Sequence, residues 1–82
     1  MLTLYVKTGC PYCARVLIEG AMLDLEFNER NIADPGVAEE LIARGGKLQT
    51  PYLVDEERGT ELYESEAIIA YLHDTFTPQS VE

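Results

Sequence analysis

The stretch LTLYVKTGCPYC, residues 2–13, contains the signals that decide the fold. Apolar residues alternate with other good strand formers over residues 2–6, which predicts a strand. Pro11 suits the first position of a helix, because a proline there loses no hydrogen bond. Apolar residues then recur at helical spacing after Cys10, although Gly20 weakens the middle of this predicted helix. Its expected apolar face comprises Val16, Leu17, Met22 and Leu23.

The rest of the chain divides into short elements with clear boundaries. A strand is expected around residues 25–31, and a helix should start at Asp34-Pro35 and end at Gly45-Gly46. A last helix should begin with Ser65 as its cap. Between these helices lies a hairpin with predicted strands at residues 51–54 and 60–63 around a turn at residues 55–59.

The expected element order is β-α-β-α-β-β-α, which predicts an α/β fold. Strand-helix-strand units pair in parallel through right-handed crossovers, whereas the hairpin adds an antiparallel edge. We therefore expect a four-stranded mixed sheet flanked by helices. A chain of 82 residues leaves room for one domain, residues 1–82, and excludes a two-domain enzyme.

Charge and cysteine content limit which partners and which cellular compartment the sequence predicts. The chain has 15 acidic and 6 basic side chains, a formal net charge of −9, which argues against nucleic acid and anionic membranes as partners. It has neither a secretory leader pattern nor a run of about 18 apolar residues, so a soluble, cytoplasmic protein is expected. Its two cysteines, Cys10 and Cys13, are too close in sequence to staple separate elements, which favours a reducing compartment.

The cysteine pair lies where the first strand gives way to the first helix. With Cys10 as the helix cap, the free amides of Tyr12 and Cys13 point at its sulfur and stabilise a thiolate. The pKa of Cys10 should therefore fall below the ~8.5 of a free cysteine, helped by the helix dipole and by positive charge on Lys7. Cys13 lies one turn deeper and should stay a thiol, which predicts a nucleophile and a resolving partner.

A zinc site is the competing interpretation of the pair. Tetrahedral zinc needs four ligands, and the only other strong candidate is His73, which is expected on the surface of the last helix. We therefore expect no metal.

At these residues the chain resembles a glutaredoxin of the thioredoxin fold over essentially its whole length. Cys10-Pro11-Tyr12-Cys13 matches the dithiol active site of that family residue for residue. Thr50-Pro51 occupies the place of the family's cis-proline, although a plain proline at a strand start is the alternative. The resemblance implies that the backbone of Thr50 pairs with the cysteinyl part of glutathione.

A third segment departs from the glutaredoxin pattern. Glu64-Ser65, before the last helix, is similar to the N-terminal domain of glutathione transferases, where such a pair holds the γ-glutamyl group. Helix amides and the Ser65 hydroxyl suit its carboxylate, and Glu64 suits its ammonium, although Ser65 could also be an ordinary cap. Candidates for the glycyl carboxylate are Lys7, Lys47 and Gln49. Tyr12 is expected to line the groove that binds glutathione, although an exposed aromatic side chain at a helix start is the alternative.

These resemblances imply a glutathione-dependent thiol-disulfide oxidoreductase that uses glutathione as co-substrate. Its expected partners are glutathionylated or disulfide-containing proteins, and a monomer is the default oligomeric state. Three alternatives stay open. The chain could be a redoxin recharged by thioredoxin reductase, or a non-catalytic glutathione-binding domain that carries an iron-sulfur cluster. It could also be a stand-alone transferase domain, which we expect to lack conjugating activity because the helical domain for the electrophile is missing.

Overall fold

The computed structural model describes residues 2–76 and has the predicted element order. The elements are β1 (Leu2–Val6), α1 (Pro11–Met22), β2 (Phe27–Asn31), α2 (Val37–Gly45), β3 (Tyr52–Asp55), β4 (Thr60–Tyr63) and α3 (Ser65–Phe76). Within residues 2–76 the strands form one mixed sheet in the order β2-β1-β3-β4. β1 pairs in parallel with β2, and the other pairings are antiparallel. The predicted four-stranded mixed sheet is therefore confirmed.

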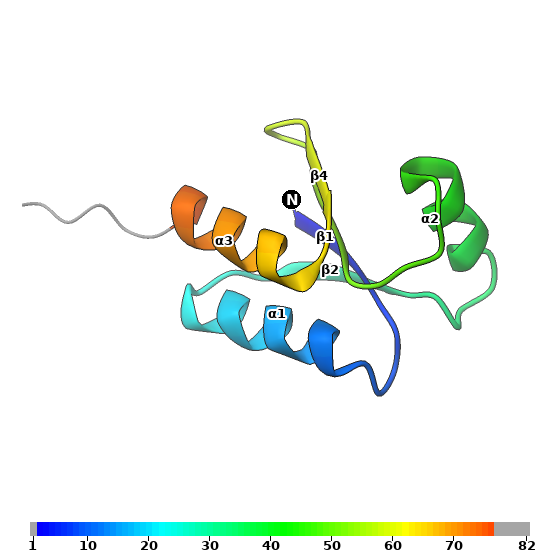
Figure 1. The fold of residues 1–82 in the computed structure, drawn as a ribbon, viewed down its shortest axis with the longest axis horizontal. Helices are drawn as coiled ribbons and strands as arrows, with labels where there is room; N and C mark the ends of the chain where they lie inside the picture. The colour runs from blue at the N-terminus through cyan, green and yellow to red at the C-terminus, as the bar shows by residue number, and fades with distance from the viewer. Residues whose placement is uncertain (1, 77–82) are drawn as a thin grey trace, which may run out of the picture.

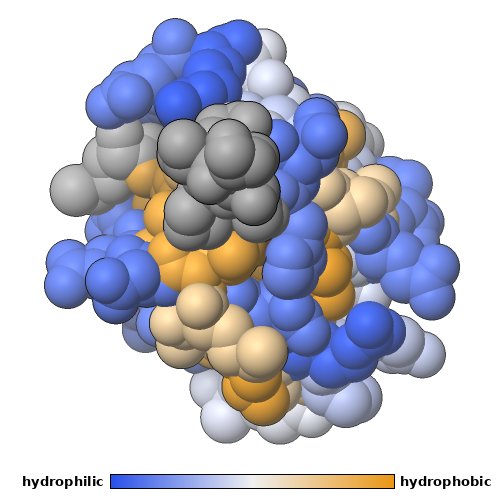
Figure 2. Space-filling model, turned by 90° about the vertical axis from the view of Figure 1, so that its left-hand side faces the viewer, coloured by the Kyte–Doolittle hydropathy of each residue, from blue (hydrophilic) through white to orange (hydrophobic). Residues whose placement is uncertain are grey.

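The two faces of the sheet are covered by different helices (Figure 1). Strand side chains alternate between faces, and the leucines and valines of one face pack with Val16, Ile68 and Leu72 of α1 and α3. Tyr5 and Tyr52 point to the other face, where they pack with residues of α2. Apolar side chains reach the surface where α1 and α3 finish (Figure 2). No helix among residues 2–76 has the length and apolar character needed to cross a membrane.

Some predicted boundaries and contacts were wrong. The helix expected from Asp34-Pro35 starts only at Val37, because Gly36 adopts a φ of 82° and interrupts the helical backbone. Its predicted end is confirmed, since Gly46 is left-handed and donates its N–H to the Ile42 carbonyl. Met22, expected on the apolar face of α1, is 72% exposed because it lies in the last turn.

Gly20 has a packing role that its helix propensity does not indicate. A Cβ atom at this position would lie 2.3 Å from the ring of Phe27. The missing side chain therefore lets the first residue of β2 approach the helix closely, which offsets the intrinsic weakness of glycine there.

Asp55, predicted to lie in the hairpin turn, is instead the last residue of β3 and is 1% exposed. Its carboxylate accepts a hydrogen bond from the Tyr71 hydroxyl at 2.6 Å and pairs with the Arg58 guanidinium at 3.3 Å. Burial raises the pKa of Asp55, but the Tyr71 hydroxyl and the Arg58 backbone and side chain lower it more, so the net shift is downward. This carboxylate ties the hairpin to α3.

Asp55→Asn should lower the free energy of unfolding at pH 7 by about 1–3 kcal/mol, because charged hydrogen bonds are lost. The folded pKa of Asp55 is depressed, so the wild-type advantage exists above the unfolded pKa of ~3.9 and disappears as pH falls through the folded value. Urea unfolding followed by circular dichroism, at neutral and strongly acidic pH, measures both effects. The matched control is Asp24→Asn on the surface, and an Asp55→Asn deficit that is equal at both pH values would contradict the assignment.

Candidate functional site

Cys10 is the N-cap residue of α1, as predicted. Its backbone is extended, with φ −83° and ψ 113°, and Pro11 opens the helix. The backbone N–H of Cys13 donates to the Cys10 sulfur at 3.2 Å. A free amide of the first helical turn thus stabilises negative charge on that sulfur.

The two cysteines are free, and their pKa values shift in opposite directions. Partial burial would raise the pKa of Cys10, but hydrogen bonds from the Cys13 thiol and amide, the Thr50 hydroxyl and the Tyr12 amide together lower it. Burial is the main cause that raises the pKa of Cys13, and its hydrogen bond to Cys10 adds to the rise. The pKa shifts therefore have the directions that the spacing predicted, while the roles of nucleophile and resolving partner stay predictions.

Thr50 brings a second segment to the Cys10 sulfur. The Thr50-Pro51 bond is cis, which confirms what the resemblance implied. The Thr50 hydroxyl donates to the Cys10 sulfur at 3.9 Å, a long contact that sulfur's large radius still allows. From the sequence, only the backbone of Thr50 was expected in the site. A hydroxyl-bearing residue before Pro51 was the signal that could have indicated this contact.

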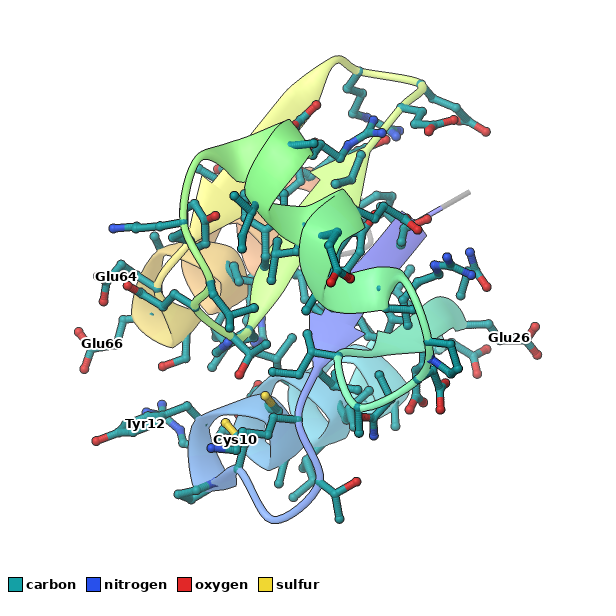
Figure 3. All side chains as sticks on the ribbon, turned by 90° about the vertical axis from the view of Figure 1, so that its right-hand side faces the viewer. Cys10, Tyr12, Glu26, Glu64 and Glu66 are labelled. Carbon is teal, nitrogen blue, oxygen red and sulfur yellow. The ribbon has the colours of Figure 1, made fainter. Side chains whose placement is uncertain are left out.

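A hollow of about 360 Å³ lies beside Cys10 and gathers most of the predicted binding residues. Its lining comprises Tyr12, Gln49, Thr50, Pro51, Glu64 and Ser65. In Figure 3, Cys10 and Tyr12 stand at the start of α1, and Glu64 lies across from them before α3. We call this hollow the groove.

The start of α3 forms one wall of the groove. Ser65 is the first residue of the helix rather than its cap and is 8% exposed. Glu64 precedes it with a φ of 78° and accepts a hydrogen bond from the Gln49 amide at 3.4 Å. Glu64-Ser65, the pair that resembles transferases, therefore lines the groove at the start of α3, and Gln49 lines it from the loop before β3.

Two residues that were candidates for binding the glycyl carboxylate, Lys7 and Lys47, lie outside the groove. Lys7 lines a separate hollow of about 250 Å³ on the other side of Cys10, together with both cysteines. The Lys47 ammonium lies 4.8 Å above the ring of Tyr63. Of the three candidates for the glycyl carboxylate, only Gln49 lines the groove. Across residues 2–76, no three His, Cys, Asp or Glu side chains are grouped as a metal site requires.

Comparison with known proteins assigns the chain to a family. The sequence profile described as "Glutathione S-transferase, N-terminal domain" matches residues 4–80. The chain belongs to this family. The similarity to transferases that Glu64-Ser65 indicated is thus confirmed, while the comparisons do not single out glutaredoxins. No curated protein sequence matches the chain.

Solved structures agree with a transferase N-terminal domain. Glutathione Transferase E6 from Drosophila melanogaster is 28% identical with a TM-score of 0.78, and the match covers 96% of this chain and 36% of that one. A delta-class glutathione transferase from Nilaparvata lugens is 26% identical with a TM-score of 0.80, covering 96% and 38%. This chain therefore spans less than two fifths of the length of these transferases.

A third solved structure supports the fold alone. A thioredoxin-like protein is 19% identical with a TM-score of 0.76, and the match covers 90% of this chain and 96% of that protein. The transferase N-terminal domain described here therefore has a thioredoxin-like fold, as expected from the sequence.

Thr50→Val should raise the pKa of Cys10 toward that of a free cysteine, because the thiolate loses a hydroxyl donor while the side-chain volume is kept. Absorbance of the thiolate near 240 nm, followed as a function of pH, measures this shift. Thr3→Val makes the same chemical change on β1, away from the sulfur, and should leave the titration unaltered. An unchanged Cys10 titration in Thr50→Val would contradict the role of the hydroxyl.

Proposed function

We propose that this domain is a glutathione-dependent thiol-disulfide oxidoreductase that reduces protein-glutathione mixed disulfides and protein disulfides. The observation that carries the proposal is the free Cys10 sulfur, with its lowered pKa, at the N-terminus of α1 beside the groove. A thiolate is the nucleophile in disulfide exchange, and a helix N-terminus with a neighbouring thiol makes it available near neutral pH.

Glutathione fits the chemistry of the groove. The buried Ser65 hydroxyl at the first turn of α3 suits the γ-glutamyl carboxylate, since free helix amides attract anions. The Glu64 carboxylate suits the ammonium group of the same moiety. Thr50 lies between this wall and Cys10, where its backbone could pair with the cysteinyl part and bring the glutathione sulfur near the Cys10 sulfur.

Reduction of a mixed disulfide needs only Cys10. Its thiolate attacks the glutathione sulfur, a Cys10-glutathione disulfide forms, and the substrate cysteine leaves as a thiolate that takes up a proton. A second glutathione thiolate then attacks the glutathione sulfur of this intermediate. Oxidised glutathione is released and the Cys10 thiolate is regenerated.

Reduction of a protein disulfide also needs Cys13. Cys10 attacks one substrate sulfur and the other leaves as a thiol after protonation. Cys13 then loses its proton and attacks Cys10, which releases the second substrate thiol and leaves a Cys10-Cys13 disulfide. Two glutathione molecules supply the electrons that reduce this disulfide and become oxidised glutathione.

Glutathione conjugation is a second candidate, favoured by membership of the transferase family. The chain covers only 36% and 38% of the length of two transferases that it matches, so a preparation of these 82 residues tests the described domain by itself. We expect no conjugation of chlorodinitrobenzene above the protein-free rate. Clear conjugation by the chain alone would favour this second function.

Cys10→Ser should abolish reduction of a glutathione mixed disulfide, whereas Cys13→Ser should retain it and lose only protein-disulfide reduction. The reason is that Cys13 serves only the second attack of the dithiol route. The measurement is NADPH consumption with glutathione and glutathione reductase as the sole electron supply. Wild-type rates in Cys10→Ser would refute the proposal. Turnover that requires thioredoxin reductase instead would reassign the electron donor.

A further inference from the structure

Tyr63 connects the two walls of the groove, although its own side chain does not line it. One wall is the start of α3, and the other is the loop between α2 and β3. Tyr63 is the last residue of β4, and the next residue, Glu64, belongs to the wall at the start of α3. On the far side, its side chain reaches the loop between α2 and β3, which supplies Gln49 and Thr50 to the groove. One side chain is therefore linked to both walls.

The Tyr63 hydroxyl bonds to both backbone groups of Lys47. It donates to the Lys47 carbonyl oxygen at 2.6 Å and accepts from the Lys47 N–H at 3.3 Å. The ring also lies beneath the Lys47 ammonium, 4.8 Å from its centroid. Lys47 precedes Gln49 by two residues, so these contacts fix the loop immediately before it enters the groove.

The ring is itself held in place by the sheet. Tyr63 pairs with Tyr52 across the β3-β4 ladder, and their ring centroids lie 4.3 Å apart. A Cβ atom at Gly45, at the end of α2, would lie 2.3 Å from the Tyr63 hydroxyl oxygen. The absence of a side chain at Gly45 thus allows the hydroxyl to reach Lys47.

We propose that Tyr63 is a positioning residue that sets the distance between the two walls of the groove, and so the affinity for glutathione. The inference rests on the proposed function. Because Tyr63 touches neither cysteine in the structure, its hydroxyl acts on binding through Lys47 and leaves the reactivity of Cys10 unchanged.

The Gly45-Gly46 pair is the sequence signal for this contact. Gly46 alone ends α2, because its φ of 95° favours glycine. Gly45 has ordinary helical geometry and no conformational need to be glycine, so its role is to make room for Tyr63.

Tyr63→Phe tests the hydroxyl while keeping the ring. We expect the Kd for S-methylglutathione, a non-reactive probe measured by calorimetry, to rise about three- to tenfold, the loss of a typical hydrogen bond. In turnover of a glutathione mixed disulfide, KM should rise by a similar factor. The kcat and the thiolate titration of Cys10 should stay at wild-type values.

Tyr52→Phe is the matched control. It removes a tyrosine hydroxyl from the neighbouring position of the same pair of strands, where that hydroxyl bonds Glu61 instead of the groove loop. This variant should keep wild-type Kd and KM, and thermal melting of both variants confirms folding. Equal rises in the two variants would show a general loss of packing and overturn the inference.

Gly45→Ala supplies a second, independent test. Its new methyl group would lie 2.3 Å from the Tyr63 hydroxyl and 2.9 Å from the ring carbon that bears it. It should therefore raise Kd in the wild-type background and have a smaller effect in Tyr63→Phe, where only the ring contact remains. Equal effects in both backgrounds would overturn the inference. If the wild type binds S-methylglutathione but shows no turnover, the proposed function is refuted. The ratio of the Tyr63→Phe and wild-type Kd values would still decide the role of Tyr63. A wild type that does not bind would refute both.

Discussion

The position of the Cys10 sulfur depends on how α1 packs against the sheet. Cys13 and Val16 are buried among Leu4 and Leu53 of the central strands, which fixes the rotation of the helix about its axis. That rotation aims the first-turn amides at the Cys10 sulfur and brings the sulfur beneath Thr50. The same burial raises the pKa of Cys13. Core packing and thiol asymmetry are therefore two consequences of one arrangement.

Apolar packing holds the helices on both faces of the sheet, and hydrogen bonds to carboxylates add to it. Aliphatic side chains pack α1 and α3, and such packing scales with buried area. On the other face, Tyr5 bonds Glu40 of α2 through its hydroxyl, and Glu40 also pairs with Arg30. Burial and the bond to Glu40 raise the pKa of Tyr5, which keeps this hydroxyl a donor. The loop after α2 thus reaches the groove from a helix that is positioned partly by directional hydrogen bonds.

Local signals allowed much of the fold to be predicted, and contacts between distant residues explain what was missed. β1 and the N-cap at Cys10 follow from alternation and from a proline at the helix start, both of which depend on adjacent residues. The predicted start of α2 was wrong because the left-handed backbone of Gly36 prevents the helix from beginning at Asp34-Pro35. Lys7 was expected near Cys10 and lines a hollow with it, but that this hollow is separate from the groove depends on the folded loop and could not be predicted from its distance in sequence.

Cys13 helps to distinguish a transferase-family domain that only binds glutathione from one that also exchanges disulfides. A buried cysteine is ordinarily a small apolar residue of a core, and Cys13 does fill that place. Its thiol, however, also bonds to Cys10 and lines the hollow on the Lys7 side. A binding site for glutathione needs no second thiol, and a single thiolate suffices for mixed disulfides. Complete reduction of a protein disulfide uses a resolving thiol beside the nucleophile, so the contact of the Cys13 thiol with Cys10 supports the dithiol route in the proposed function.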